Sequence, residues 1–265
     1  FNRRSSPQII TVANKIRNDG LRQESIYNDF TLGEISFYNL NIDRKEIIDF
    51  YINKWNVHKD NKLHCLELTN EKVAEQSGFI DLYNFFKNSS WYKLGRNFEF
   101  LREHILSLDE NKFGIIQKLI FRILDFKTNA NKDSTMLMDI FRKNHLNGVN
   151  IIDLRKLVDK LQSITGNTLE EYLTNIFNLY KNGDHRYDLC IEYVIAEEIK
   201  SLGSFKQFIL NQLYYFSGDQ EFSEDDTVKY EKEVNDFLKI NMTILDLWYS
   251  FITDTCQGEV IYRTY

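Results

Sequence analysis

The first ninety residues alternate between helical and extended patterns of apolar positions. Residues 7–17 carry apolar side chains at helical spacing, and serines precede them in the place of an N-cap. Residues 33–40 and 62–68 alternate apolar and polar positions and are rich in β-branched or aromatic residues, which predicts two strands. Asp43 and Thr69 are suited to cap the helix that follows each strand. The order strand, helix, strand, helix predicts a small parallel α/β unit.

Beyond about residue 90 the pattern is helical almost to the end of the chain. Apolar residues recur with helical spacing in segments 97–108, 112–126, 134–145, 151–164, 168–181, 187–201, 204–216, 224–239 and 242–254. Ser204 and Gln207 have the spacing of a capping box, which predicts a helix start at that serine. Residues 258–265 return to strand character. We therefore expect a mostly α protein in which two α/β fragments flank a helical block.

Composition excludes several classes of protein. With 43% hydrophobic and 14% aromatic residues the chain can bury a core, and its apolar runs are far shorter than the roughly 18 residues that span a bilayer. Three cysteines, Cys65, Cys190 and Cys256, are odd in number and far apart, which fits reduced thiols. No secretory signal and no initiator methionine are present, so we expect a cytoplasmic fragment of a longer protein.

The charge and the motifs narrow the possible chemistry. A formal net charge of −6 argues against a protein that holds nucleic acid by overall electrostatics, although it leaves local contacts open. The chain contains no GxxxxGK[ST], GxGxxG, GxSxG or HExxH motif, and its five histidines lack the spacing of zinc ligands. We therefore expect no metal site and no self-sufficient active site.

The opening FNRRSSPQIITVANKIRN suggests a phosphate contact. Arg3, Arg4 and two serines stand immediately before a helix that begins at Pro7, and free backbone N–H groups with guanidinium groups are suited to phosphate oxygens. The same residues are also consistent with a well-capped helix that carries two surface arginines. The residues alone leave both interpretations open.

Residues 2–16 resemble motif IV of the UvrD/Rep family of superfamily 1 DNA helicases. Residues 62–79 are similar to the segment called motif IVa of that family, and residues 258–265 are similar to the strand that leads into motif V. The three segments occur in the order that the family requires. The resemblance implies that residues 1–88 and 256–265 are parts of the second RecA-like motor domain, and that residues 89–255 are an inserted helical subdomain.

The resemblance also implies roles for individual residues. Arg4 falls on the arginine that reaches the γ-phosphate of ATP and serves catalysis, whereas Arg3 replaces the aromatic residue that stacks on adenine. Thr69 and Asn70 fall on positions near the DNA strand, and Leu68 replaces an arginine expected there. Thr264 falls on the motif V threonine, which implies a DNA contact, and it is equally consistent with an ordinary strand residue.

Cofactors and partners follow from the same resemblance. The full-length protein would use ATP and Mg²⁺, would bind single-stranded DNA and junctions with duplex DNA, and would hold this fragment against the remaining helicase domains. The fragment lacks the phosphate loop, the acidic metal-binding motif and motif VI, so we expect it to bind no cofactor and to be inactive alone. The alternative is a helical interaction or regulatory module of helicase ancestry without helicase activity, with a protein partner on the helical subdomain.

Overall fold

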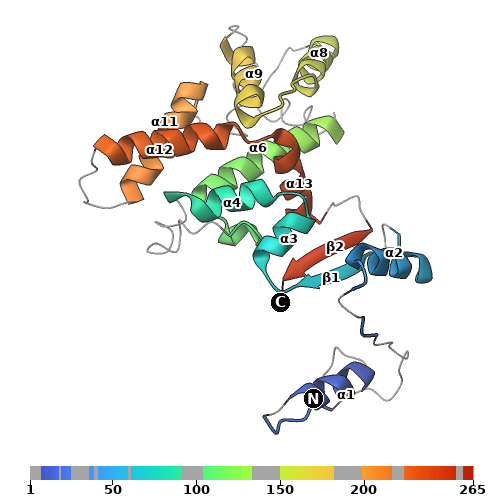
Figure 1. Cartoon of the computed structure of the whole chain (residues 1–265). Helices are drawn as coiled ribbons and strands as arrows, with labels where there is room; N and C mark the ends of the chain where they lie inside the picture. The colour runs from blue at the N-terminus through green and yellow to red at the C-terminus, as the bar shows by residue number, and fades with distance from the viewer. Residues whose placement is uncertain are drawn as a thin grey trace. The chain divides into compact units, whose positions relative to one another are not determined.

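The computed structural model describes residues 7–17, 19–24, 36–38, 41–58, 61–90, 104–132, 150–181, 199–216, 224–254 and 259–264. The chain divides into two compact units, residues 1–58 and 59–265, and Figure 1 shows the elements of each. Helices make up most of the described residues, which confirms the mostly α prediction. Among the helices that the structure describes, none is both long and apolar enough to cross a membrane.

The first unit contains helices α1 (Pro7–Ile16) and α2 (Arg44–Lys54). Asp43 caps α2 as predicted, because its side chain accepts a hydrogen bond from the backbone N–H of Lys45. The strand predicted over 33–40 is wrong at residues 36–38, which have no regular structure, and its other residues lie outside the described part. In this segment the Tyr38 hydroxyl donates a hydrogen bond to the Tyr51 hydroxyl on α2, at 2.9 Å.

The second unit contains a parallel pair of strands, β1 (Leu63–Glu67) and β2 (Val260–Thr264). Helix α3 (Asn70–Gln76) lies against both strands, and α4 (Ile80–Asn88) follows it. Gly78 separates the two helices with φ +82, and a Cβ there would lie 2.9 Å from Leu247 Cδ1. The strands predicted over 62–68 and 258–265 are confirmed, and the structure pairs them in parallel across the helical block that connects them.

The helices that the structure describes in the helical block occur in the predicted order. Its elements are the 3₁₀ turn η2 (Glu110–Lys112) and helices α6 (Ile115–Lys132), α8 (Ile151–Gln162), α9 (Leu169–Lys181), α11 (Leu202–Phe216), α12 (Glu224–Leu238) and α13 (Met242–Ile252). The helix predicted over 134–145 lies outside the described residues, as does most of that predicted over 187–201. Residues 199–201, which are described, are not helical.

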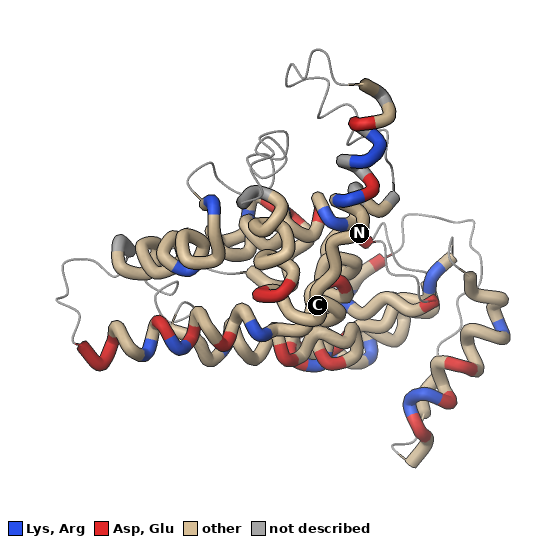
Figure 2. Tube along the Cα trace, turned by 90° about the horizontal axis from the view of Figure 1, so that it is seen from above, with Lys and Arg blue, Asp and Glu red and all other residues tan. Residues whose placement is uncertain are grey.

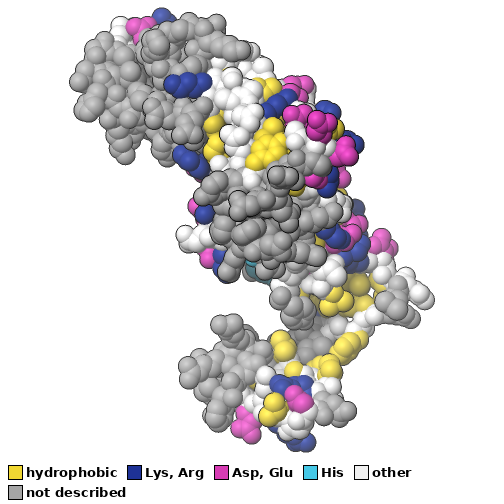
Figure 3. Space-filling view, turned by 90° about the vertical axis from the view of Figure 1, so that its left-hand side faces the viewer, with side chains coloured by type: hydrophobic (Ala, Val, Ile, Leu, Met, Phe, Trp, Pro, Cys, Tyr) yellow, Lys and Arg dark blue, Asp and Glu magenta, His cyan; other side chains and the backbone are white. Residues whose placement is uncertain are grey.

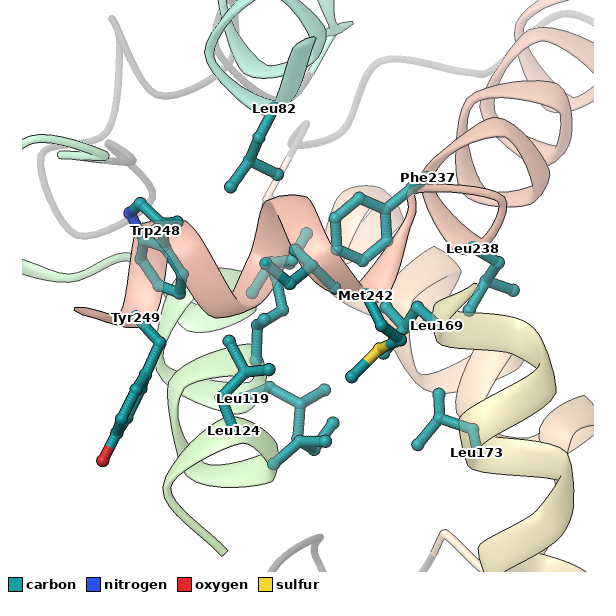
Figure 4. Close-up of a cluster of buried hydrophobic side chains, with 14 of the residues drawn as sticks. Leu82, Leu119, Leu124, Leu169, Leu173, Phe237, Leu238, Met242, Trp248 and Tyr249 are labelled. Atoms are coloured by element: carbon teal, nitrogen blue, oxygen red, sulfur yellow. The ribbon is translucent and has the colours of Figure 1, made fainter. Parts of the chain in front are cut away.

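Helix α13 occupies the centre of the core (Figure 4). Leu245 and Trp248 on this helix are fully buried, and α13 contacts both α4 and α6. Figure 4 shows side chains from α4, α6, α9 and α12 converging on α13: Leu82, Leu119, Leu124, Leu169, Leu173, Phe237 and Leu238. Because α3 and α4 contribute residues to the same core and Tyr262 of β2 packs against it, this one apolar cluster joins the strand pair to the helical block.

Two local predictions are wrong, the first because of tertiary contacts and the second because a local cap forms three residues earlier. Residues 104–108, the described part of the helix predicted over 97–108, form turns. Their carbonyls accept hydrogen bonds from side chains: His104 from Gln117 at 3.0 Å and Ile105 from Trp248 at 2.8 Å. Further along, α11 begins two residues before the predicted Ser204, and the Ser201 hydroxyl accepts from the Ser204 N–H while the Ser204 hydroxyl accepts from the Ser201 N–H.

Polar contacts between distant elements fix the helices relative to one another. Glu233 on α12 accepts the N–H and the hydroxyl of Ser90, each at 2.9 Å. Residues Thr168 and Asn241 form an antiparallel bridge that ties the start of α9 to the start of α13.

On the surface, acidic and basic residues are interspersed along the described helices (Figure 2), and apolar side chains lie among charges of both signs on one face (Figure 3).

Candidate functional site

The candidate site begins where β1 ends. Thr69 adopts an extended backbone conformation, with φ −134 and ψ 148, and forms the N-cap of α3. Its hydroxyl oxygen accepts from the Lys72 N–H at 3.3 Å. Asn70 is the first residue of α3, and both predicted DNA-contact residues are exposed. The sequence therefore places a hydroxyl and an amide at the surface just beyond a strand, as the motif IVa resemblance implies.

Strand β2 brings the third predicted residue to the same edge. In the parallel register Glu67 pairs with Thr264, so the carboxyl ends of both strands coincide. Thr69 and Asn70 follow β1 at this edge, and Thr264 is the last residue of β2. In parallel α/β sheets, ligands bind in the crevice outside the carboxyl ends of the strands. The structure thus gathers the three residues, although the whole helical block separates them in sequence.

Glu67 is a buried carboxylate at this edge that the sequence reasoning missed. It is 7% exposed, on the strand face that also carries Leu63 and Cys65. A charged residue at an inward strand position is uncommon, since burying a carboxylate without a partner is costly. Its position in the alternation of residues 63, 65 and 67 is the signal that could have identified it.

The charges beside the edge neutralise one another. The Lys72 ammonium lies 2.5 Å from a Glu75 carboxylate oxygen, and this hydrogen bond is the main cause that raises the pKa of Lys72, with smaller contributions from other carboxylates including Glu67. Lys87 lies 2.9 Å from Glu71, and its hydrogen bond lowers the pKa of that carboxyl group. The edge therefore offers hydroxyl and amide hydrogen bonds, whereas these two cations are already paired.

The predicted nucleotide contacts cannot be placed in this geometry. Arg3 and Arg4 lie outside the described residues. Among the residues that are described, no three or more potential metal-ligating side chains cluster together.

A polar depression lies at the turn before α9. It is lined by Thr165, Gly166, Asn167, Glu170, Glu171, Thr174 and Asn175. Its polar groups serve the local fold: Glu171 accepts from the Asn167 N–H at 2.8 Å, and Asn175 donates to the Thr165 carbonyl at 2.7 Å. Such capping contacts account for the residues without any ligand.

Comparison with known proteins gives one informative similarity. The chain is 36% identical over 268 residues to the Gabija protein GajB of Bacillus cereus (strain HuB5-5). The chain is similar to GajB throughout. The alignment covers 100% of this chain but 38% of GajB, so the chain spans less than two fifths of the length of that relative. No protein-family model and no solved structure matches the chain.

The similarity to GajB bears directly on the candidate site. Because the alignment covers the whole chain, the carboxyl edge of β1 and β2 lies within the shared region. GajB also extends well beyond the aligned region, by 62% of its length (100% minus 38%). A relative of that length has room for further domains outside the shared part.

Proposed function

We propose that this chain is the second motor-domain part, with its inserted helical subdomain, of an ATP-dependent 3′-to-5′ DNA helicase or translocase. The observation that carries the proposal is the parallel pairing of β1 with β2. This pairing puts Thr69, Asn70 and Thr264 at one edge, as the motif IVa and motif V resemblances require. Neither the secondary-structure propensity of the two strands nor the packing of the helical block requires these three residues to lie at the same edge.

The described edge residues would act on the DNA strand. The hydroxyl groups of Thr69 and Thr264 and the amide of Asn70 would hydrogen-bond to the sugar-phosphate backbone or to bases. With Lys72 and Lys87 already paired to carboxylates, the edge would hold DNA mainly by hydrogen bonds and weakly by charge. Weak holding is suited to a motor that must release and rebind the strand at each step.

The nucleotide would lie between this domain and the first motor domain. Arg4 would reach across to the γ-phosphate and stabilise the charge of the transferring phosphoryl group, and Arg3 would lie beside the base. ATP binding would close the two motor domains, and the helical subdomain would move with them to engage duplex DNA. Mg²⁺ would be bound with the phosphates by residues outside this chain.

The test uses the full-length protein and the variant Arg4→Ala. We expect this variant to lose DNA-stimulated ATP hydrolysis, by about 10³-fold or more, while nucleotide affinity changes little. Arg17→Ala is the matched control, because Arg17 forms a surface ion pair with Asp19 at 2.5 Å and has no proposed role in the chemistry. Strand separation should require a 3′ single-stranded tail. Normal turnover in Arg4→Ala, or no DNA-dependent turnover in the unaltered protein, would refute the proposal.

A second function is favoured by the charge at the edge. A helical interaction or regulatory module without helicase activity would need no free cations there, and Lys72 and Lys87 are both paired. This alternative predicts that the unaltered full-length protein neither hydrolyses ATP in response to DNA nor separates strands. The same turnover measurement therefore decides between the two functions.

A further inference from the structure

Arg263 lies on β2 directly before Thr264, and its side chain packs against the end of α13. Its guanidinium carbon is 4.6 Å from the centroid of the Phe251 ring. Nη2 lies 3.3 Å from Asp254 Oδ1, and Nη1 donates to the Tyr262 carbonyl oxygen at 3.0 Å. The side chain of Arg263 is 21% exposed. A largely buried guanidinium thus links the last turn of the helical block to the strand that ends at the candidate site.

The partners of Arg263 are themselves firmly placed. Phe251 is 2% exposed in the core and packs on Phe79, with ring centroids 5.1 Å apart. Asp254 follows the C-cap of α13 with φ +54, a left-handed conformation that glycine, asparagine and aspartate adopt more readily than other residues. Glycine and asparagine would suit this backbone, but neither has a carboxylate to reach Arg263. Aspartate therefore fits both the local backbone and the contact.

Stability alone does not account for this arrangement. The side chain of Asp254 is 60% exposed, so water screens its ion pair with Arg263 and the pair adds little to the free energy of unfolding. However, a planar guanidinium that lies over an aromatic ring and also bonds to a carboxylate fixes the orientation of the two elements as well as their distance. The contact is therefore suited to holding β2 in a defined position relative to α13.

We propose that Arg263 is a positioning residue that couples the position of the helical block to the strand carrying Thr264. When the helical block moves, the guanidinium transmits the displacement of the end of α13 to β2, one residue from the proposed DNA contact. The role in DNA handling rests on the proposed function, whereas the mechanical link between α13 and β2 does not. A contiguous contact with a defined geometry is one physical route by which elements are coupled.

The test compares three variants of the full-length protein. Arg263→Gln removes the charge and the stacked fork, and Asp254→Asn removes the carboxylate while keeping a residue that tolerates a positive φ. Lys239→Gln is the control, because it makes the same charge change in an exposed pair with Asp236, 3.6 Å away, within the helical block. Two quantities are measured: base pairs separated per ATP hydrolysed, and hydrogen–deuterium exchange of the β2 amides.

We expect Arg263→Gln and Asp254→Asn to lower the base pairs separated per ATP by roughly two- to thirty-fold, with basal hydrolysis unchanged. The double variant should be no worse than the more severe single variant, because both substitutions break one contact. Exchange at residues 260–264 should be faster than in Lys239→Gln, while exchange within α13 stays the same. A merely structural role would change stability without changing the ratio of strand separation to hydrolysis.

Two results would overturn the inference. In the first, Arg263→Gln and Lys239→Gln show the same number of base pairs separated per ATP and the same exchange of the β2 amides. In the second, the effects of Arg263→Gln and Asp254→Asn add independently in the double variant. If the unaltered protein shows no DNA-dependent hydrolysis, the proposed function fails, and the exchange of β2 alone decides whether Arg263 links that strand to α13. The failure of the inference and the failure of the proposed function are therefore distinguishable.

Discussion

Restoring an arginine at position 68 tests directly whether a DNA strand passes the carboxyl edge of β1. The side chain of Leu68 is 90% exposed, so Leu68→Arg displaces no packed group and should change the free energy of unfolding by less than about 0.5 kcal/mol. The new guanidinium would stand immediately before Thr69, within reach of a phosphate of a bound strand. Its effect should appear in DNA binding and not in folding.

The salt dependence of binding gives the expected magnitude. Each phosphate contact to single-stranded DNA steepens the slope of log K against log salt by about 0.7. Between 50 and 200 mM salt, one new contact should therefore weaken binding about 2.6-fold more in the variant than in the unaltered protein. Because Lys72 and Lys87 are already paired beside this edge, an unpaired arginine should be easy to detect against the starting slope.

The assay is fluorescence anisotropy of a labelled thymidine oligonucleotide with the full-length protein over a series of salt concentrations. Val228→Arg is the matched control, since Val228 on α12 is 66% exposed and gains the same charge away from the edge. Non-specific attraction would steepen both slopes equally. Equal slopes for the two variants would refute our placement of the strand beside Leu68.

Three further predictions concern the core and its polar contacts. Trp248→Phe removes an indole N–H that donates to the Ile105 carbonyl and trims a fully buried side chain, so the free energy of unfolding in urea should fall by about 2–4 kcal/mol. Glu233→Ala leaves the N–H and hydroxyl of buried Ser90 without their acceptor, which should cost about 1–3 kcal/mol, and Glu233→Gln should cost less. Burial raises the pKa of the Tyr172 hydroxyl, so above about pH 10 the unfolded chain loses a proton that the folded chain keeps. Stability should then decline as pH rises, and less steeply in Tyr172→Phe.

Each of these predictions has a result that would contradict it. Leu247 is 42% exposed on the same helix as Trp248, so Leu247→Ala should cost much less than Trp248→Phe, and equal losses would argue against the core assignment. An unchanged unfolding midpoint in Glu233→Ala would show that Ser90 finds other partners. Parallel pH profiles for Tyr172→Phe and the unaltered protein would exclude a buried, protonated hydroxyl.

Local sequence signals were enough to predict structural features that depend on contacts between residues close together in the chain. Asp43 and Thr69 could be recognised as caps because a capping side chain bonds to an N–H two or three residues away. The strand character of residues 62–68 and 258–265 was predictable from their local alternation, whereas their parallel pairing across the helical block was not predicted. The predicted division at residues 88 and 256, and the roles of Arg3 and Arg4, stay predictions.

Long-range contacts explain what the sequence could not predict. The apolar period continues through residues 104–108, but side chains from Gln117 and Trp248 draw the carbonyls of this segment out of any helix. The contact between Arg263 and Asp254 joins the end of α13 to β2, and no local pattern of residues signals a contact between these two elements. At the edge, Glu67 became significant once its register with Thr264 was known.

The central position of α13 has a consequence for synthesis of the protein on the ribosome. Helices α4, α6 and α9 are translated before the helix on which they pack, and about 70 residues separate the end of α9 at Lys181 from the end of α13 at Ile252. At about 5–20 residues per second, the apolar face of α9 waits roughly 4–14 s for that partner, and those of α4 and α6 wait longer. During this interval the nascent chain exposes side chains such as Leu82, Leu124 and Leu173, which are fully buried in the finished protein. The nascent helical block is therefore a natural client for chaperones until its last helix emerges.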